Sequence, residues 1–170
     1  MMTIEEAIKT ALEYETKIRD IYKEAADKVS DPAGQRILTM LRDDEENHIA
    51  YLKSRLELWK KTGTLSVKKL ETIIPPVDVI QKETEKVATH MPQQHKTGEK
   101  EILSRALKAE IETSHFYQQM VDEMSGEGQQ MFARFLEIEE SHIAAVQFEL
   151  DYVMKSGYWF DFKEFDMEDF

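Results

Sequence analysis

Six ionisable residues fall on helix faces that are otherwise apolar, and they constrain the fold of this chain more than any other feature. They are Glu15, Glu45, His48, Glu110, Glu139 and His142. Apolar residues surround each of them at the 3.6-residue period of a helix that packs on a core, so all six should point inward. A buried carboxylate without a partner costs several kcal/mol. Four of them therefore need a neutralising partner, and two divalent cations would serve.

The spacing of the histidines supports a metal site. Glu45 precedes His48 by three positions, and Glu139 precedes His142 by three. Residues three apart on a helix lie on the same face, so each glutamate and its histidine can reach one point in space. This arrangement suits a metal ion.

The chain also repeats itself. A glutamate followed seven residues later by a tyrosine occurs at Glu15 and again at Glu110, 95 positions further on. The Glu-x-x-His pair that begins at Glu45 recurs at Glu139, 94 positions further on. Each half therefore reads as a helix hairpin of similar size. Two such hairpins packed about a pseudo-twofold axis would place all six residues around one centre.

This pattern resembles the ferritin-like diiron-carboxylate superfamily, in which two helices each give a Glu and two others each give a Glu-x-x-His. Within it, the chain is similar to the diiron domain of rubrerythrin-like proteins, from about Ile4 to Val153. The resemblance implies an all-α fold, a ferritin-like four-helix bundle with a long crossover between helices 2 and 3. We place the bundle at residues 1–157, the crossover at about 61–96 and a C-terminal tail at 158–170.

The resemblance also implies roles for the six residues. Glu15 and His48 would be terminal ligands of one iron ion, and Glu110 and His142 those of a second. The glutamates that would bridge the two ions are Glu45 and Glu139. Four carboxylates with only two imidazoles favour iron or manganese, and zinc could occupy the site as a substitute.

Two tyrosines, Tyr22 and Tyr117, follow the glutamates of the repeat by seven residues. They are candidates to donate hydrogen bonds to the ligand carboxylates and so to orient them. The alternative for each is a buried tyrosine whose hydroxyl is satisfied by the backbone or by water.

Two features depart from rubrerythrin. The chain contains no cysteine, so it lacks the four-cysteine iron domain that supplies electrons in that family. In addition, Thr113 stands one turn after Glu110, where rubrerythrins carry a further carboxylate ligand. Glu112 cannot replace this carboxylate. It follows Glu110 by two residues, and side chains two residues apart on a helix point in different directions. The six-residue set is closer to that of the bacterioferritin centre.

The resemblance implies an oxidoreductase that reduces hydrogen peroxide or dioxygen with electrons from an external donor, with no catalytic residue beyond the metal ligands. One alternative is a ferroxidase, for which iron is the substrate. Another is a structural or regulatory metal-binding module without turnover. The ligand residues are common to all three and do not separate them.

The connection between the halves contains further candidates. The stretch Val77 to Met91 has the apolar spacing of a short extra helix that would cover the bundle. His90 and His95 also fall in the connection and could bind a metal, but surface histidines are commoner. His115 lies off the core stripe. The same two alternatives, a metal ligand or an ordinary surface histidine, apply to it.

The tail is unusually aromatic. Six of the last 13 residues are aromatic: Tyr158, Trp159, Phe160, Phe162, Phe165 and Phe170. A solvated tail would not tolerate so many, so we expect it to dock on the bundle or on a second copy of the chain. The alternative is a binding site for an electron donor. A homodimer is common among ferritin-like proteins, and the tail is our candidate contact.

The net charge of −12 argues against a nucleic-acid partner, because phosphate contacts need a basic surface. The residues from Met1 to Glu6 begin a charged amphipathic helix rather than a signal peptide. No apolar run is long enough to span a bilayer, so we expect no membrane association and a cytoplasmic location.

Overall fold

The computed structural model describes residues 1–87 and 97–162 of the 170-residue chain. This part of the chain is helical and contains no strand. The helices are α1 (Ile4–Lys28), α2 (Pro32–Thr62), α3 (Val77–Val87), α4 (Thr97–Glu123) and α5 (Gly126–Ser156). The predicted all-α class is thus confirmed for the described residues. His90, His95 and the expected end of the short helix at Met91 lie outside them.

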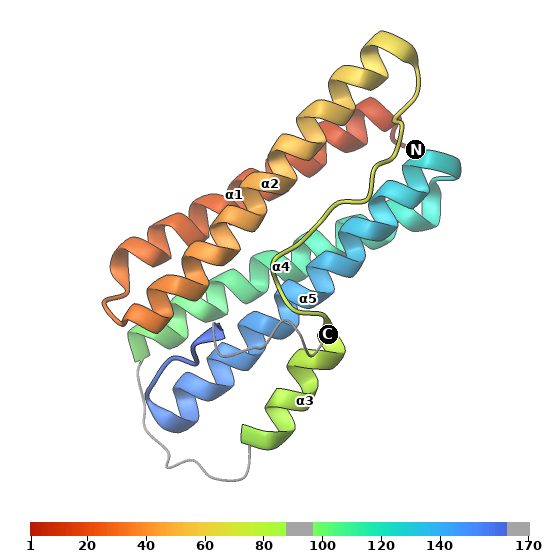
Figure 1. The fold of residues 1–170 in the computed structure, drawn as a ribbon. Coiled ribbons are helices and arrows are strands. Elements are labelled where there is room, and N and C mark those ends of the chain that lie inside the picture. Colours follow the sequence, from red (N-terminus) through yellow and green to blue (C-terminus); the bar gives the residue numbers. More distant parts are fainter. Residues whose placement is uncertain (88–96, 163–170) are drawn as a thin grey trace.

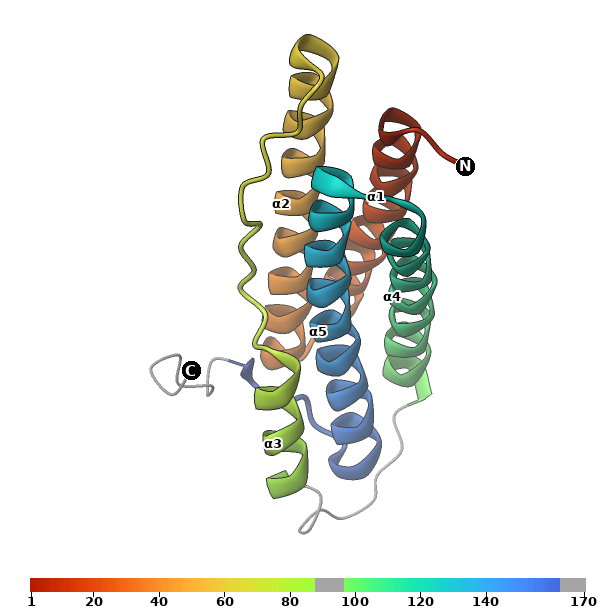
Figure 2. The ribbon, with the colours of Figure 1, turned by 90° about the vertical axis from the view of Figure 1, so that its right-hand side faces the viewer.

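The four long helices form two antiparallel hairpins. Helix α1 packs along α2, α4 packs along α5, and α1 also contacts α4 (Figure 1). Helices α2 and α4 run in the same direction, so the chain has to return along the bundle between them (Figure 2). It does so through an extended stretch, residues 63–76, which we call the connecting segment. The shorter α3 follows this segment and packs on α5.

The ends of the helices follow from local sequence. Thr3 caps α1. Its side chain accepts a hydrogen bond from the Glu6 amide, and the Glu6 carboxylate accepts one from the Thr3 amide. Asp31 caps α2, where Pro32 occupies the first turn. Gly63 ends α2 with φ of 70°, a left-handed conformation that glycine adopts without steric cost.

The connecting segment is held by side chains, because an extended segment that pairs with no strand leaves its backbone carbonyl groups unsatisfied. Arg55 donates to the Leu65 carbonyl at 2.9 Å, and Tyr51 donates to the carbonyl of residue 68 at 2.6 Å. From α5, Arg134 donates to the Leu70 carbonyl at 2.9 Å. The segment is therefore fixed to both helices as it passes the middle of the bundle.

The apolar core is divided into two clusters along the bundle axis. In α1 one cluster takes Ala7 to Ala11 and the other takes Ile18 to Ala25, and Glu15 lies between them. Helix α2 runs the opposite way, so it meets the two clusters in the opposite order, with Glu45 and His48 between them. Helices α4 and α5 repeat the pattern. The buried polar residues thus occupy the middle of the bundle, with apolar packing above and below.

The described part of the tail lies against the chain's own helices. Trp159, Phe160 and Phe162 are buried, and Phe160 stacks edge to face on Phe148 of α5 with ring centroids 4.9 Å apart. Tyr158 by contrast is 63% exposed. Residues 163–170, with Phe165 and Phe170, lie outside the described part of the chain. Among the described helices, none has both the length and the apolar character that a membrane span requires.

Candidate metal centre

The structure brings all six predicted site residues together in the middle of the bundle. Their side chains have no exposed surface. Glu15 comes from α1, Glu110 from α4, and one Glu-x-x-His pair from each of α2 and α5. Each hairpin therefore contributes three of the six, as the repeat predicts.

The donor atoms of these residues form two groups, each compact enough to hold a metal ion. In each group the atoms lie within 4.8 Å of one another. One group is Glu15, Glu45, His48 and Glu139, and the other is Glu45, Glu110, Glu139 and His142. Glu45 and Glu139 belong to both groups. This sharing is the arrangement that two neighbouring ions bridged by carboxylates would need.

Glu45 contacts both imidazole rings. Its Oε2 is 3.3 Å from Nδ1 of His48, and its Oε1 is 2.8 Å from Nδ1 of His142. The outer glutamates complete the two sides, because Glu15 Oε2 is 3.5 Å from His48 Nδ1 and Glu110 Oε1 is 3.1 Å from His142 Nδ1. Both rings thus turn their Nδ1 atoms toward carboxylates.

Several carboxylate oxygens in this cluster are buried and accept no hydrogen bond. They are Oε2 of Glu15, both oxygens of Glu45, Oε2 of Glu110 and both oxygens of Glu139. Buried acceptors of this kind are costly unless something neutralises them. Hard divalent cations prefer carboxylate oxygens supplemented by imidazole, so the residues present fit two such ions.

Without metal, the cluster should retain protons on the two shared glutamates. Burial and the charge of Glu15 raise the pKa of Glu45 to about 8. Burial and the charge of Glu110 likewise raise the pKa of Glu139 well above its ordinary value. Two neutral carboxyls at the centre reduce the repulsion among the four glutamates.

The outer pairs behave as ion pairs. Burial opposes the charged form of His48, but its contacts with Glu45, Glu15 and Asp44 together outweigh burial and raise its pKa. The pKa of His142 is raised in the same way, chiefly by Glu110. Although burial alone would raise it, the pKa of Glu15 is lowered to about 2 by Glu45 and His48. Metal binding at these residues would have to displace protons.

The two tyrosines connect the hairpins crosswise. Tyr22 of α1 donates to Oε1 of Glu110 in α4 at 2.5 Å, and Tyr117 of α4 donates to Oε1 of Glu15 in α1 at 2.5 Å. Burial and the partner's charge raise the pKa of both phenols, so both remain neutral donors. Of the two readings that the sequence allows, the structure has the hydrogen bond to the site carboxylate in both places.

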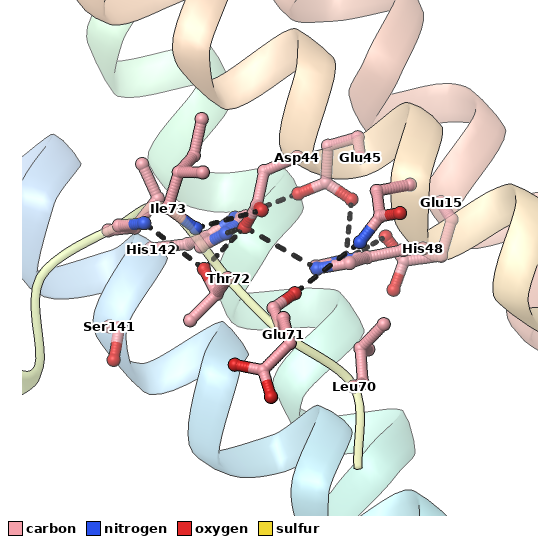
Figure 3. A network of polar contacts seen from close by, with 12 residues as sticks. Glu15, Asp44, Glu45, His48, Leu70, Glu71, Thr72, Ile73, Ser141 and His142 are labelled. Atoms are coloured by element: carbon pink, nitrogen blue, oxygen red, sulfur yellow. Dashed lines mark hydrogen bonds and ion pairs between the residues drawn. The ribbon is translucent and has the colours of Figure 1, made fainter. Parts of the chain in front are cut away.

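Sequence reasoning missed Asp44, which lies on the other side of the two rings (Figure 3). Its Oδ2 is 2.7 Å from Nε2 of His142 and 3.4 Å from Nε2 of His48. The signal was present, because Asp44 precedes His48 by four residues and therefore shares its helix face. The adjacent acidic residues in Asp43-Asp44-Glu45-Glu46 hid it.

Asp44, His48 and His142 also lie close enough together to be considered as a metal site. Asp44 is already engaged, because its Oδ2 accepts from the Thr72 hydroxyl at 2.7 Å and its Oδ1 accepts from the Ile73 amide at 3.3 Å. Three of the oxygens without hydrogen bonds, Oε2 of Glu15 and both oxygens of Glu45, lie 2.8–3.5 Å from the Nδ1 atoms instead. The Nδ1 side is thus the better place for metal ions, and Asp44 is a partner of the histidines.

Three other residues that the sequence raised do not join the cluster. Thr113 is buried, and its hydroxyl donates to the Ala109 carbonyl at 2.9 Å. Glu112 accepts from Lys17 at 3.4 Å in a pair that is exposed. His115 is exposed on α4.

Comparison with known proteins gives no relative. No family model, no curated protein and no solved structure matches the chain. A functional assignment therefore has to be argued from the geometry and chemistry of the site itself.

Proposed function

We propose that this chain is a ferritin-like diiron-carboxylate oxidoreductase that reduces hydrogen peroxide, or dioxygen, with electrons from an external donor. The observation that carries the proposal is the position of Glu45 and Glu139, which are common to two groups of metal-binding atoms. A shared pair of carboxylates suits two adjacent ions that act together on one small oxidant.

The arrangement of the helices supports the ferritin-like assignment. Four long helices in two hairpins, with a long return between parallel α2 and α4, agree with the topology of that fold. Iron is the metal we favour, because four carboxylates and two imidazoles suit it and because it can change oxidation state. Manganese is the alternative with the same ligand preference.

Two ferrous ions held by this site would supply the two electrons that, with two protons, convert one hydrogen peroxide molecule into two water molecules. The protein's contribution is to hold six donor groups in place and to keep bulk water out. The apolar clusters above and below exclude solvent. The Tyr22 and Tyr117 hydroxyls fix the two outer carboxylates by hydrogen bonds across the bundle.

The electron donor is proposed to be a separate molecule. The chain has no cysteine, so it holds neither an iron–sulfur site nor a redox-active thiol of its own. Homodimer formation and the cytoplasmic location remain predictions from the sequence.

The test is anaerobic stopped-flow spectroscopy of the chain loaded with ferrous iron. One sample is mixed with hydrogen peroxide and another with dioxygen, and the absorbance of the oxidised iron is followed. We expect faster oxidation by peroxide, and loss of this rapid phase in Glu139→Ala but not in the exposed control Glu140→Ala. No reaction with either oxidant would contradict an oxidoreductase and leave a metal site of structural importance only.

A ferroxidase is the second candidate, and Thr113 is the observation that favours it. Its hydroxyl is turned onto its own helix, so the position that would hold a seventh ligand offers no carboxylate. A six-residue set of this kind resembles the bacterioferritin centre. Repeated turnover with dioxygen and added ferrous iron, without any other donor, would decide for the ferroxidase.

A further inference from the structure

Asp44 faces both histidines on the side away from the carboxylate cluster, and it is hydrogen-bonded to His142. Asp44 Oδ2 lies 2.7 Å from His142 Nε2 and 3.4 Å from His48 Nε2. The pseudo-twofold repeat would allow a second acid, four residues before His142. Ile138 occupies that position and is buried in the apolar core. Asp44 is therefore the one acid behind the two rings, hydrogen-bonded to His142 and within ion-pair distance of His48.

This contact determines which ring nitrogen is available to a metal. A neutral imidazole carries one proton, and a carboxylate at Nε2 keeps the proton there. Nδ1 of His142 is then left as a lone pair that faces the glutamates, and the nearby Asp44 carboxylate favours the same tautomer of His48. A carboxylate behind a ligand histidine fixes both its tautomer and its orientation.

The connecting segment holds Asp44 in turn. The Thr72 hydroxyl donates to Oδ2 at 2.7 Å, and the Ile73 amide donates to Oδ1 at 3.3 Å. The Thr72 oxygen also accepts from the Ile74 amide at 3.2 Å, which fixes the local turn. The carbonyl of residue 71, just before this turn, accepts a hydrogen bond from the Asn47 side chain of α2 at 3.4 Å. The segment thus meets α2 at the turn that carries the site residues (Figure 3).

We propose that the connecting segment is a working part of the metal centre. Thr72 and Ile73 hold Asp44 as the acceptor for His142 and close to His48, so docking of the segment and binding of metal stabilise each other. The inference rests on the proposed metal centre. Asp44 and Thr72 are positioning residues, since they act through His48 and His142. The stabilisation is mutual because coupling between two equilibria is reciprocal. If metal binding favours the docked connecting segment, then docking of the segment increases the affinity for metal.

The first test is titration with cobalt(II), a redox-silent probe under these conditions whose absorbance reports ligand geometry. Asp44→Asn should still bind two ions per chain, with affinity reduced about 10–100-fold, the usual cost of losing such a partner. Thr72→Val should lose part of this affinity, and Thr72→Ser, which keeps the hydroxyl, should recover it. Matched controls are Asp43→Asn beside the site and Thr84→Val in α3, and both should bind as wild type does.

Two further measurements separate positioning from a general loss of structure. Proton spectra of the cobalt-loaded protein should show a slowly exchanging imidazole N–H signal from His142, which Asp44→Asn loses by fast exchange with solvent. Hydrogen exchange of amides around residues 70–74 should slow on cobalt binding in wild type, and less so in Thr72→Val.

Each failure has its own meaning. If wild type binds two cobalt ions and Asp44→Asn keeps both the affinity and the His142 N–H signal, this inference is wrong while the metal centre stands. If Asp44→Asn binds one ion fewer, Asp44 is a ligand and the positioning role is wrong. If wild type binds no cobalt, the proposed metal centre itself fails.

Discussion

The phenol of Tyr117 donates a 2.5 Å hydrogen bond to Oε1 of Glu15, which lies 102 positions earlier in the chain. The second half of the molecule thereby fixes a carboxylate that the first half contributes, and Tyr22 does the reverse for Glu110. These crossed contacts join the two hairpins at the level of the site. They are direct targets for mutation.

Tyr117→Phe should destabilise the metal-free protein by about 1–3 kcal/mol, because it leaves a buried carboxylate without its donor. Tyr22→Phe should have a similar effect. The measurement is urea unfolding followed by circular dichroism, with the exposed Tyr158→Phe as control. If both core variants had the same urea midpoint of unfolding as wild type, these hydrogen bonds would contribute nothing to stability.

The metal-free protein should lose stability as the pH rises from about 5 to about 8. The pKa of Glu45 is raised from 4.5 to about 8, so the unfolded chain releases this proton at lower pH than the folded chain does. The raised pKa values of Glu139, His48 and His142 act in the same direction. Scanning calorimetry of chelator-treated protein should therefore show a falling unfolding temperature over this range. A rise would contradict the proton-retaining cluster.

Bound metal should reverse this dependence. Metal ions compete with protons for the same atoms, so affinity increases as the pH rises. The increase in unfolding temperature that cobalt produces should accordingly be larger at pH 8 than at pH 6, in the same calorimetric series. An increase that is independent of pH would place the bound metal away from the buried glutamates and histidines.

Glu149→Gln should stabilise the protein at pH 8 and have little effect near pH 5. Glu149 is buried on α5, and its Oε2 accepts from the Phe160 amide at 3.1 Å. Burial raises its pKa, so the folded state becomes less favourable as the pH rises above 4.5 and the unfolded chain ionises. Urea unfolding at the two pH values measures this difference. The exposed control Glu140→Gln should show none, and an equal effect in both variants would dismiss a special role for Glu149.

Gly34→Ala should displace the described part of the tail. A Cβ at this position would lie 2.7 Å from Val29 and 2.8 Å from the Trp159 ring, closer than real contacts allow. Overpacking of this kind costs about 1–3 kcal/mol. In a Trp59→Phe background, the emission of Trp159 should shift to longer wavelength as the ring becomes hydrated. Gly98→Ala, where the new Cβ meets nothing within 4 Å, is the control.

The six site residues could be predicted from the sequence because each breaks an apolar helix stripe, and periodicity alone shows which face is buried. Asp44 could not be separated from its acidic neighbours, since its role depends on His142, which is 98 positions away. Thr72 gives no periodic signal at all, because it acts from an extended segment. The packing of the Trp159 ring against Gly34 could not be predicted either, because it is a contact between distant parts of the chain.

The central claim is that the buried cluster binds two metal ions through the shared glutamates. Its most direct test is the iron content of protein loaded anaerobically with ferrous iron and freed of excess, for wild type, Glu139→Ala and Glu140→Ala. We predict two ions per chain for wild type and for the exposed control, and fewer than two for Glu139→Ala. Two ions retained by Glu139→Ala, or none bound by wild type, would contradict the account.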